Sequence, residues 1–300
     1  MRRCASAIAA RLAATLPAAV LLSAALLAAG CGSPAPRTVN APHEAALATG
    51  QRAARALQRG QTTQALALYE QALAAADSVE DFDTSGAMLL NLALVHSRLN
   101  QPREAHQRVD RVLAAPARYA GALQSQAAAR KALLHLDARE GPQALQWADK
   151  AQAACDSPCA LAPVLAHVRG QVALDAGDAV QAAALATRAA ELAAAGGQQV
   201  EQANAHRLLG RAQMQLRDHT AAAASLQRAL DIDRALGLPD RIALDLLYAG
   251  DNEQRAGRRA EAIAFFERAL QVSVAAGLTP SADAARQRLK ALDVASPRVP

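Results

Sequence analysis

Small and bulky apolar residues recur along the chain at helical spacing, and residues 249–270 show the unit most clearly. There, Gly250 and Ala262 are small residues twelve apart, Gly257 lies between them, and Phe266 and Ala269 follow in a large-then-small order. Small residues at fixed positions let two antiparallel helices approach closely, while the aromatic ring fills the groove beside them. The unit therefore predicts a pair of helices with its turn at Gly257.

The same unit recurs six times in register. The second small position advances in steps of 40, 39, 38, 40 and 40 residues. The first small position is Ala53, Ala93, Ala132, Gly170, Gly210 and Gly250; the second is Ala65, Ala105, Ala144, Ala182, Ala222 and Ala262; the bulky position is Tyr69, Val109, Ala148, Ala186, Leu226 and Phe266. A fixed period of this length indicates a repeat array that grows in one dimension.

The register predicts six helix pairs and one further helix. The expected pairs are 44–58 with 62–77, 85–98 with 102–115, 118–136 with 142–154, 161–174 with 178–195, 199–216 with 220–236, and 240–256 with 259–276. An amphipathic helix over 281–292 caps the array, with Ala285, Leu289 and Leu292 facing it and Arg286, Arg288 and Lys290 facing water. The helical domain thus covers 44–293, and 294–300 form a disordered tail.

The repeat resembles the tetratricopeptide repeat, whose helix pairs carry small residues twelve apart, a turn glycine and an aromatic four residues after the second small one. The resemblance covers roughly residues 44–276 and implies an all-α, right-handed superhelical solenoid of about six helix pairs. The period departs from the family's usual 34 residues or so, and resembles the longer variant seen in kinesin light chains. Most of the family's aromatic positions are aliphatic or alanine here.

Residues 1–30 have the pattern of a targeting signal. Arg2, Arg3 and Arg11 are followed by an apolar stretch over 16–27 and small residues before Cys31. The sequence Leu-Ala-Ala-Gly-Cys ending at Cys31 resembles a bacterial lipobox, which implies cleavage before Cys31 and lipidation of its thiol. Ala28 stands where that family prefers leucine. The alternatives are a secretory signal that releases the protein into the periplasm, or an uncleaved anchor.

The residues after Cys31 indicate where the protein is carried and how it is held. Gly32, in place of an aspartate, favours the outer membrane by resemblance to proteobacterial lipoproteins. Residues 31–43 contain several prolines and few apolar residues, so they predict a flexible tether. We therefore expect a chain anchored by lipid at the periplasmic face of the outer membrane.

The charge balance gives little support for a nucleic-acid partner. The formal net charge is +5, and it falls to +2 once the three basic residues of the signal are removed. The aromatic content is 2%, which also disfavours a base-stacking surface. We expect no nucleic-acid ligand.

Cys155 and Cys159 are the sharpest chemical feature of the repeat domain. In an oxidising periplasm, two thiols between one helix and the next predict a short-loop disulfide. A thiol-redox function is an alternative, although the spacing has one residue more than the thioredoxin-like motif. A metal site with His167 as a third ligand is another, and its spacing matches no common zinc pattern.

The remaining residues show no motif for catalysis. The seven histidines are scattered, and the chain lacks a nucleophile elbow, a P-loop and a His-Glu-x-x-His zinc motif. We therefore expect no enzyme activity, no cofactor and no metal.

The resemblance to the repeat family implies that the first helix of each pair lines a concave groove that binds a protein or peptide. Carried over by the register, the expected groove residues are Asn91, His167, Gln171, Asn204, Arg207, Arg211, Asp251 and Arg255. Arg207 and Arg211 are one helical turn apart and would receive a carboxylate or an acidic segment, or else remain solvated charges.

These observations favour a lipid-anchored scaffold for protein–protein interactions in the bacterial cell envelope. One alternative is a pilot or assembly lipoprotein for an outer-membrane secretin or pilus-type machine. An alternative of another class is a periplasmic redox protein that uses Cys155 and Cys159.

Overall fold

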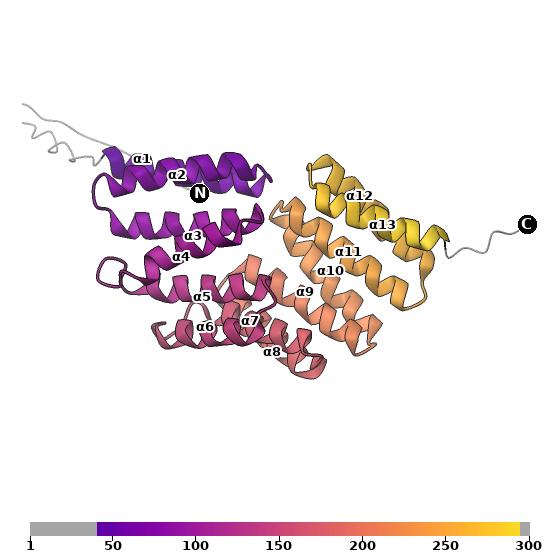
Figure 1. Cartoon of the computed structure of the whole chain (residues 1–300). Helices are drawn as coiled ribbons and strands as arrows, with labels where there is room; N and C mark the ends of the chain where they lie inside the picture. The colour runs from indigo at the N-terminus through magenta and orange to yellow at the C-terminus, as the bar shows by residue number, and fades with distance from the viewer. Residues whose placement is uncertain (1–40, 295–300) are drawn as a thin grey trace, which may run out of the picture. The chain divides into compact units, whose positions relative to one another are not determined.

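The computed structural model describes residues 41–294, and the targeting signal, most of the tether and the tail lie outside that range. Within it, the chain forms thirteen helices and no strand (Figure 1). The helices are α1 (Ala41–Gln58), α2 (Thr62–Asp77), α3 (Phe82–Arg98), α4 (Pro102–Leu113), α5 (Ala122–Asp137), α6 (Gly141–Ala153), α7 (Ala162–Asp175), α8 (Ala179–Ala195), α9 (Gln199–Gln215), α10 (His219–Ala235), α11 (Pro239–Arg255), α12 (Arg259–Ala275) and α13 (Thr279–Val294). The predicted six pairs and the last helix are confirmed.

The positions of the repeat register form the core of the structure. All six alanines of the second small series, from Ala65 in α2 to Ala262 in α12, are fully buried. The bulky positions four residues later are buried as well, including Tyr69 and Phe266. Since alanine supplies many of these positions, the core of each pair depends on close approach of the two helices.

Close approach is clearest at the glycines of the first small series. A Cβ atom added at Gly250 would lie 2.3 Å from Cε1 of Phe266, and one added at Gly210 would lie 2.6 Å from Cγ of Leu226. Both distances are far below van der Waals contact. The aromatic and leucine side chains of α12 and α10 therefore occupy the space that a side chain on the facing helix would need.

The first and third helices begin earlier than the hydrophobic pattern indicates. Helix α1 begins at Ala41, three residues before the expected position, with Pro42 in its first turn, where a missing N–H costs nothing. Helix α3 begins at Phe82 because Asp81 acts as its N-cap and accepts a hydrogen bond of 3.1 Å from the backbone N–H of Thr84.

The connection before α5 is longer than expected. The helix begins at Ala122 instead of residue 118, because Gly121 adopts a positive φ of 58° that ends the preceding turn. Tyr119 in this connection is buried, and its ring lies edge-on to that of Phe82 with 6.5 Å between centroids. The segment is thus a packed corner that joins two repeats.

The packing between repeats gives the array its inner surface. The first helices of neighbouring pairs, α1, α3, α5, α7, α9 and α11, pack against one another in sequence. In the described chain the backbones of the second helices, α2 to α12, of neighbouring pairs do not approach in this way, and α2 and α4 are joined by the ion pairs of Arg108 with Glu70 and of Arg111 with Asp77. An array whose first helices lie closer together curves toward them, so these helices form its concave side.

Helix α13 covers the last pair, as predicted. Ala285 and Leu292 are buried in a cluster with Phe266. Arg288 was expected to face water, but its guanidinium makes two hydrogen bonds to the carboxylate of Asp251, at 2.7 and 3.0 Å. The cap is therefore held by a bidentate ion pair as well as by apolar contacts.

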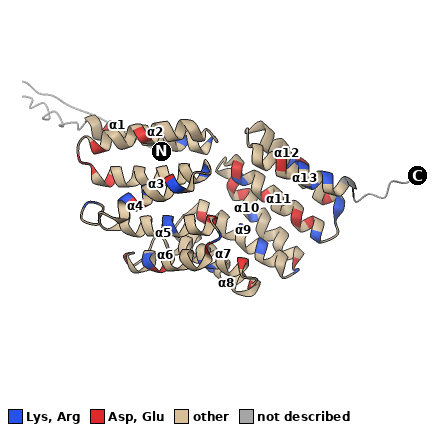
Figure 2. Ribbon diagram, in the orientation of Figure 1, with Lys and Arg blue, Asp and Glu red and all other residues tan. Residues whose placement is uncertain are grey.

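Charged residues of both signs are interspersed along the helices (Figure 2). None of the helices in residues 41–294 is both long and apolar enough to cross a bilayer.

Candidate partner-binding surface

The residues expected in the groove all lie on first helices, and the structure divides them between two cavities and a buried network. We refer to the side formed by α3, α5, α7, α9 and α11 as the inner surface. Asn91 belongs to α3, His167 and Gln171 to α7, three residues to α9 and two to α11.

The first cavity lies among α3, α5, α7 and the start of α9 and has a volume of about 450 Å³. Asn91 lines it, as expected, beside leucines of α3 and α5. Sequence reasoning missed Arg130 and Gln126 of α5, which line the same cavity. Their repeat carries Ala129 and Leu133 at the positions that the register examines, so neither residue stood out. The cavity combines an apolar floor with amide and guanidinium donors and the carboxylate of Glu201, a composition suited to a peptide.

The second cavity lies between α7, α9 and α11 and measures about 320 Å³. It brings together Arg211, Asp251 and Arg255, three of the residues expected in the groove. Tyr248 also lines it, and the guanidinium of Arg211 lies 5.2 Å from the centre of that ring. Sequence reasoning missed Tyr248 because it precedes the first small position of its repeat by two residues.

Two further groups fix the position of Arg211. Its Nη1 atom donates a hydrogen bond of 2.5 Å to Oε1 of Gln171, and the amide nitrogen of Gln171 donates to Asp175 at 2.7 Å. Gln171, also expected in the groove, therefore holds a cation at the surface of the second cavity.

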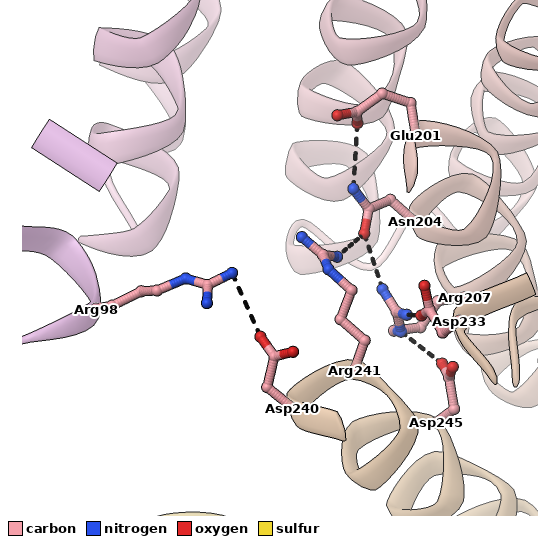
Figure 3. Close-up of polar contacts among 8 residues, drawn as sticks. All are labelled: Arg98, Glu201, Asn204, Arg207, Asp233, Asp240, Arg241 and Asp245. Atoms are coloured by element: carbon pink, nitrogen blue, oxygen red, sulfur yellow. Dashed lines mark hydrogen bonds and ion pairs between the residues drawn. The ribbon is translucent and has the colours of Figure 1, made fainter. Parts of the chain in front are cut away.

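Arg207 does not belong to the exposed surface, and its assignment as a groove contact was wrong. Its side chain is 8% exposed and lies between two fully buried carboxylates (Figure 3). The Nε atom donates to Oδ1 of Asp245 at 2.6 Å, and Nη2 donates to Oδ2 of Asp233. Because both contacts are internal, Arg207 serves to hold α9 against α10 and α11.

Asn204 extends this network toward the inner surface. Its Oδ1 accepts hydrogen bonds from Arg207 and from Arg241, and its Nδ2 donates to Glu201 at 3.1 Å (Figure 3). The side chain was expected to contact a partner and is instead used inside the molecule. Arg241 and Glu201, which sequence reasoning did not select, are the charged residues that it positions.

Burial dominates the protonation of the groups around Arg207. It raises the pKa of Asp245 to about 7, against the attraction of Arg207, and it also raises the pKa of Asp233. His167 shows the opposite shift: burial, and then the nearby charges of Arg207, Arg211 and Arg241, lower its pKa to about 4. Its Nδ1 is buried with no hydrogen-bond partner in the described chain.

The connection between α6 and α7 contains a disulfide between Cys155 and Cys159, with 5.4 Å between the Cα atoms. The bond spans four residues and joins the end of one repeat to the start of the next. Neither sulfur is then available as a thiolate ligand.

Comparisons with known proteins agree with the repeat geometry. Residues 203–236, most of α9 and α10, match the tetratricopeptide repeat family model. This protein has a tetratricopeptide repeat fold. A comparison with curated proteins finds no match.

Solved structures of similar fold differ widely in sequence from this tetratricopeptide array. A Rap protein complexed with competence and sporulation factor has a TM-score of 0.59 at 13% identity, over 80% of this chain and 69% of that one. The APC/C hetero-tetramer Cut9-Hcn1 has a TM-score of 0.60 at 16% sequence identity, and the match covers 83% of this chain and 43% of the other. PilW, a type IV pilus biogenesis factor, has a TM-score of 0.51 at 18% sequence identity, and the match covers 79% of this chain and 96% of PilW. At these identities the comparisons establish the fold.

Proposed function

We propose that this protein is a non-catalytic scaffold that binds a protein or peptide on its inner surface. The observation that supports this most strongly is the pair of cavities on the first helices, lined by donors such as Asn91, Arg130, Arg211 and Arg255. Guanidinium and amide groups donate hydrogen bonds to carbonyl and carboxylate oxygens, and the apolar floor accommodates side chains between them.

Cross-linking from envelope fractions tests the scaffold function. Full-length protein and a variant with Arg211→Glu and Arg255→Glu are compared for the partners they capture. The matched control carries Arg188→Glu and Arg228→Glu, which change the charge equally on the second helices α8 and α10. We expect the groove variant to lose the partner and the control to keep it, with helicity unchanged in both. A partner retained by both variants would contradict binding at the second cavity.

We further propose that the scaffold is attached by lipid at Cys31 to the periplasmic face of the outer membrane. The support is the lipobox-like sequence that ends at Cys31 and the glycine that follows it. Metabolic labelling with an alkyne fatty acid tests the modification, followed by separation of inner and outer membranes. We expect Cys31→Ser to abolish the label and to shift the protein out of the outer-membrane fraction. Equal labelling of wild type and variant would refute the anchor.

A second candidate function is assembly of an outer-membrane secretin or pilus-type machine. The similarity in fold to PilW, over nearly the full length of that chain, favours it specifically. In a deletion strain we expect the multimers of one outer-membrane protein to be lost while its monomer persists. Unchanged multimers of every secretin in the strain would rule out this function.

A further inference from the structure

Three guanidinium groups converge on the inner surface although their helices are distant in sequence. Arg98 is the last residue of α3, Arg130 belongs to α5, and Arg241 belongs to the first turn of α11. Burial is the main cause that lowers the pKa of Arg130 and of Arg241, and the charge of Arg98 lowers both further. Arg98 is therefore close enough to repel both of the other cations. Glu201, which lines the same cavity as Arg130, accepts from Asn204, and Asn204 in turn accepts from Arg241, so this chain of contacts joins the two.

Among residues 41–294, one carboxylate forms an ion pair with this cluster. Oδ2 of Asp240 lies 3.3 Å from Nη2 of Arg98, and both side chains are about one-third exposed (Figure 3). Two other acids lie within electrostatic reach of Arg130, but each is held by a neutral partner. Glu201 accepts from Asn204, and Asp137 accepts from Ser97 at 3.0 Å.

Arg130 has no hydrogen bond or ion pair with any residue in 41–294. It lines the first cavity, beside Asn91 and the apolar side chains of Leu90 and Leu133. Arg241 donates to the neutral oxygen of Asn204. A half-buried guanidinium without an acceptor loses hydration that nothing in the free protein replaces, so an anion that reaches it binds with a gain.

The ion pair between Arg98 and Asp240 also joins residues that are far apart in the sequence. The two residues lie on helices four repeats apart, and α3 and α11 do not pack against each other. The turn between α1 and α2, in the first repeat, also lies near the C-terminal end of α12 in the sixth. A Cβ atom added at Gly60 would lie 3.8 Å from the carbonyl oxygen of Ala276. Asp240 thus joins the second repeat to the sixth through a side-chain contact.

We propose that Arg98, Arg130 and Arg241 form a binding site for an acidic segment of the partner, and that Asp240 occupies part of this site in the free protein. This inference rests on the scaffold function proposed above and specifies its ligand. A segment with several carboxylates engages Arg130 from the first cavity and replaces Asp240 on Arg98. Binding therefore breaks the ion pair between Arg98 and Asp240 while it neutralises the cluster.

Binding of hexaglutamate amide tests the proposal, with hexaglutamine amide as the uncharged probe. Fluorescence anisotropy is measured with dye-labelled peptides and the full chain in detergent. We expect Arg130→Gln to weaken hexaglutamate binding about tenfold, the loss of one charge-assisted hydrogen-bonded contact. Arg169→Gln is the matched control, because Arg169 loses the same charge but pairs with Asp149 at 3.0 Å between α6 and α7.

Replacement of Asp240 tests the proposal in the opposite direction, because it should strengthen hexaglutamate binding. Asp240→Asn removes the competing carboxylate, so we expect hexaglutamate to bind about threefold more tightly, as for loss of a partly exposed ion pair. Asp149→Asn changes the net charge equally and leaves the cluster intact. A general attraction between a more cationic protein and an acidic peptide would move both variants alike.

The outcomes separate this inference from the scaffold function. Selective weakening by Arg130→Gln together with selective tightening by Asp240→Asn supports the site. Equal effects of the matched variants, no preference over hexaglutamine, or no binding to wild type overturn it. Partner capture in the cross-linking experiment is measured independently, and failure of the wild-type protein to capture any partner would overturn the scaffold function itself. Unchanged helicity and thermal unfolding show that each variant is folded.

Discussion

Two titratable residues near Arg207, Asp245 and His167, respond to pH in opposite directions. The pKa of Asp245 is raised from its ordinary value of 3.8 to about 7, so its contribution to stability is complete below pH 3.8 and is lost as the pH rises to about 7. The pKa of His167 is lowered from 6.5 to about 4, so its contribution is complete above pH 6.5 and is lost as the pH falls through 4. Between these limits the two effects oppose each other.

Single substitutions should reveal the two opposing slopes. In Asp245→Asn, we expect the free energy of unfolding to fall more steeply than in wild type as the pH drops from 6.5 to 4.5. In His167→Gln, we expect the free energy of unfolding to rise relative to that of wild type as the pH drops over the same range. Each difference in slope is at most about 1.4 kcal/mol per pH unit, the value for one proton. Urea denaturation at a series of pH values measures it, and parallel curves for all three proteins would contradict the assigned protonation states.

Gly250 tests the close approach of α11 and α12. Gly250→Ala gains helix propensity, but its Cβ would lie 2.3 Å from the ring of Phe266, which is fully buried and has no room to move. We expect a net loss of about 1–3 kcal/mol in unfolding free energy, as for overpacked cores. Gly196→Ala is the control, because its nearest neighbour is the flexible side chain of Gln198 at 3.3 Å. A stabilised Gly250→Ala protein would show that the helices are farther apart.

At the residue scale, spacing predicted burial well and predicted the roles of charged residues poorly. The register identifies small and bulky core positions because each repeat buries the same face against its own partner helix. Arg207 falls at a groove position of that register, but its two acidic partners lie 26 and 38 residues away, on α10 and α11. Asp233 belongs to the second helix of the same repeat and Asp245 to the next repeat, and the spacing of small and bulky positions encodes neither pairing. Arg288 was misassigned for the same reason, since Asp251 lies 37 residues before it.

Among the elements, the helices follow from the sequence more closely than the connections do. Helices α8 to α12 lie within one or two residues of the predicted bounds, because turn residues interrupt the hydrophobic period at each end. The corner before α5 was missed because it contains Tyr119, whose apolar ring continues the helical pattern. Its conformation depends on packing against α3, which brings Phe82 to the ring.

The disulfide between α6 and α7 provides a prediction about one connection. Replacing Cys155 and Cys159 together by serine removes a small loop from the unfolded chain, so we expect the unfolding free energy to fall by about 2 kcal/mol. The partner captured by the full-length protein should be unchanged, because the bond lies outside the groove residues. Denaturation of wild type with and without reductant gives the same comparison in an unaltered sequence. Loss of a thiol-dependent activity with unchanged stability would instead favour the redox function.

For the whole molecule, the packing of successive first helices means that each repeat depends mainly on its neighbours. Stability in such an array is approximately a sum of repeat and interface contributions, and damage at one end stays local. The buried cluster of α11, α12 and α13 contains Phe266, Leu246 and Leu292. The cluster at the other end, which includes Tyr69 and Leu92, is separate.

Removal of α13 tests this local dependence. A chain that ends at Gly277 exposes apolar surface around Phe266 and loses the bidentate contact between Arg288 and Asp251. We expect hydrogen exchange to accelerate strongly in α11 and α12, and little in α1 to α6, because the nearest-neighbour interfaces there are intact. Arg286→Ala is the control, since that residue pairs only with Asp283 on the exposed face of the same helix. Equal acceleration in every helix would mean that the array unfolds as one cooperative unit, and that contacts across it, such as Arg98 with Asp240, contribute more than packing between neighbours.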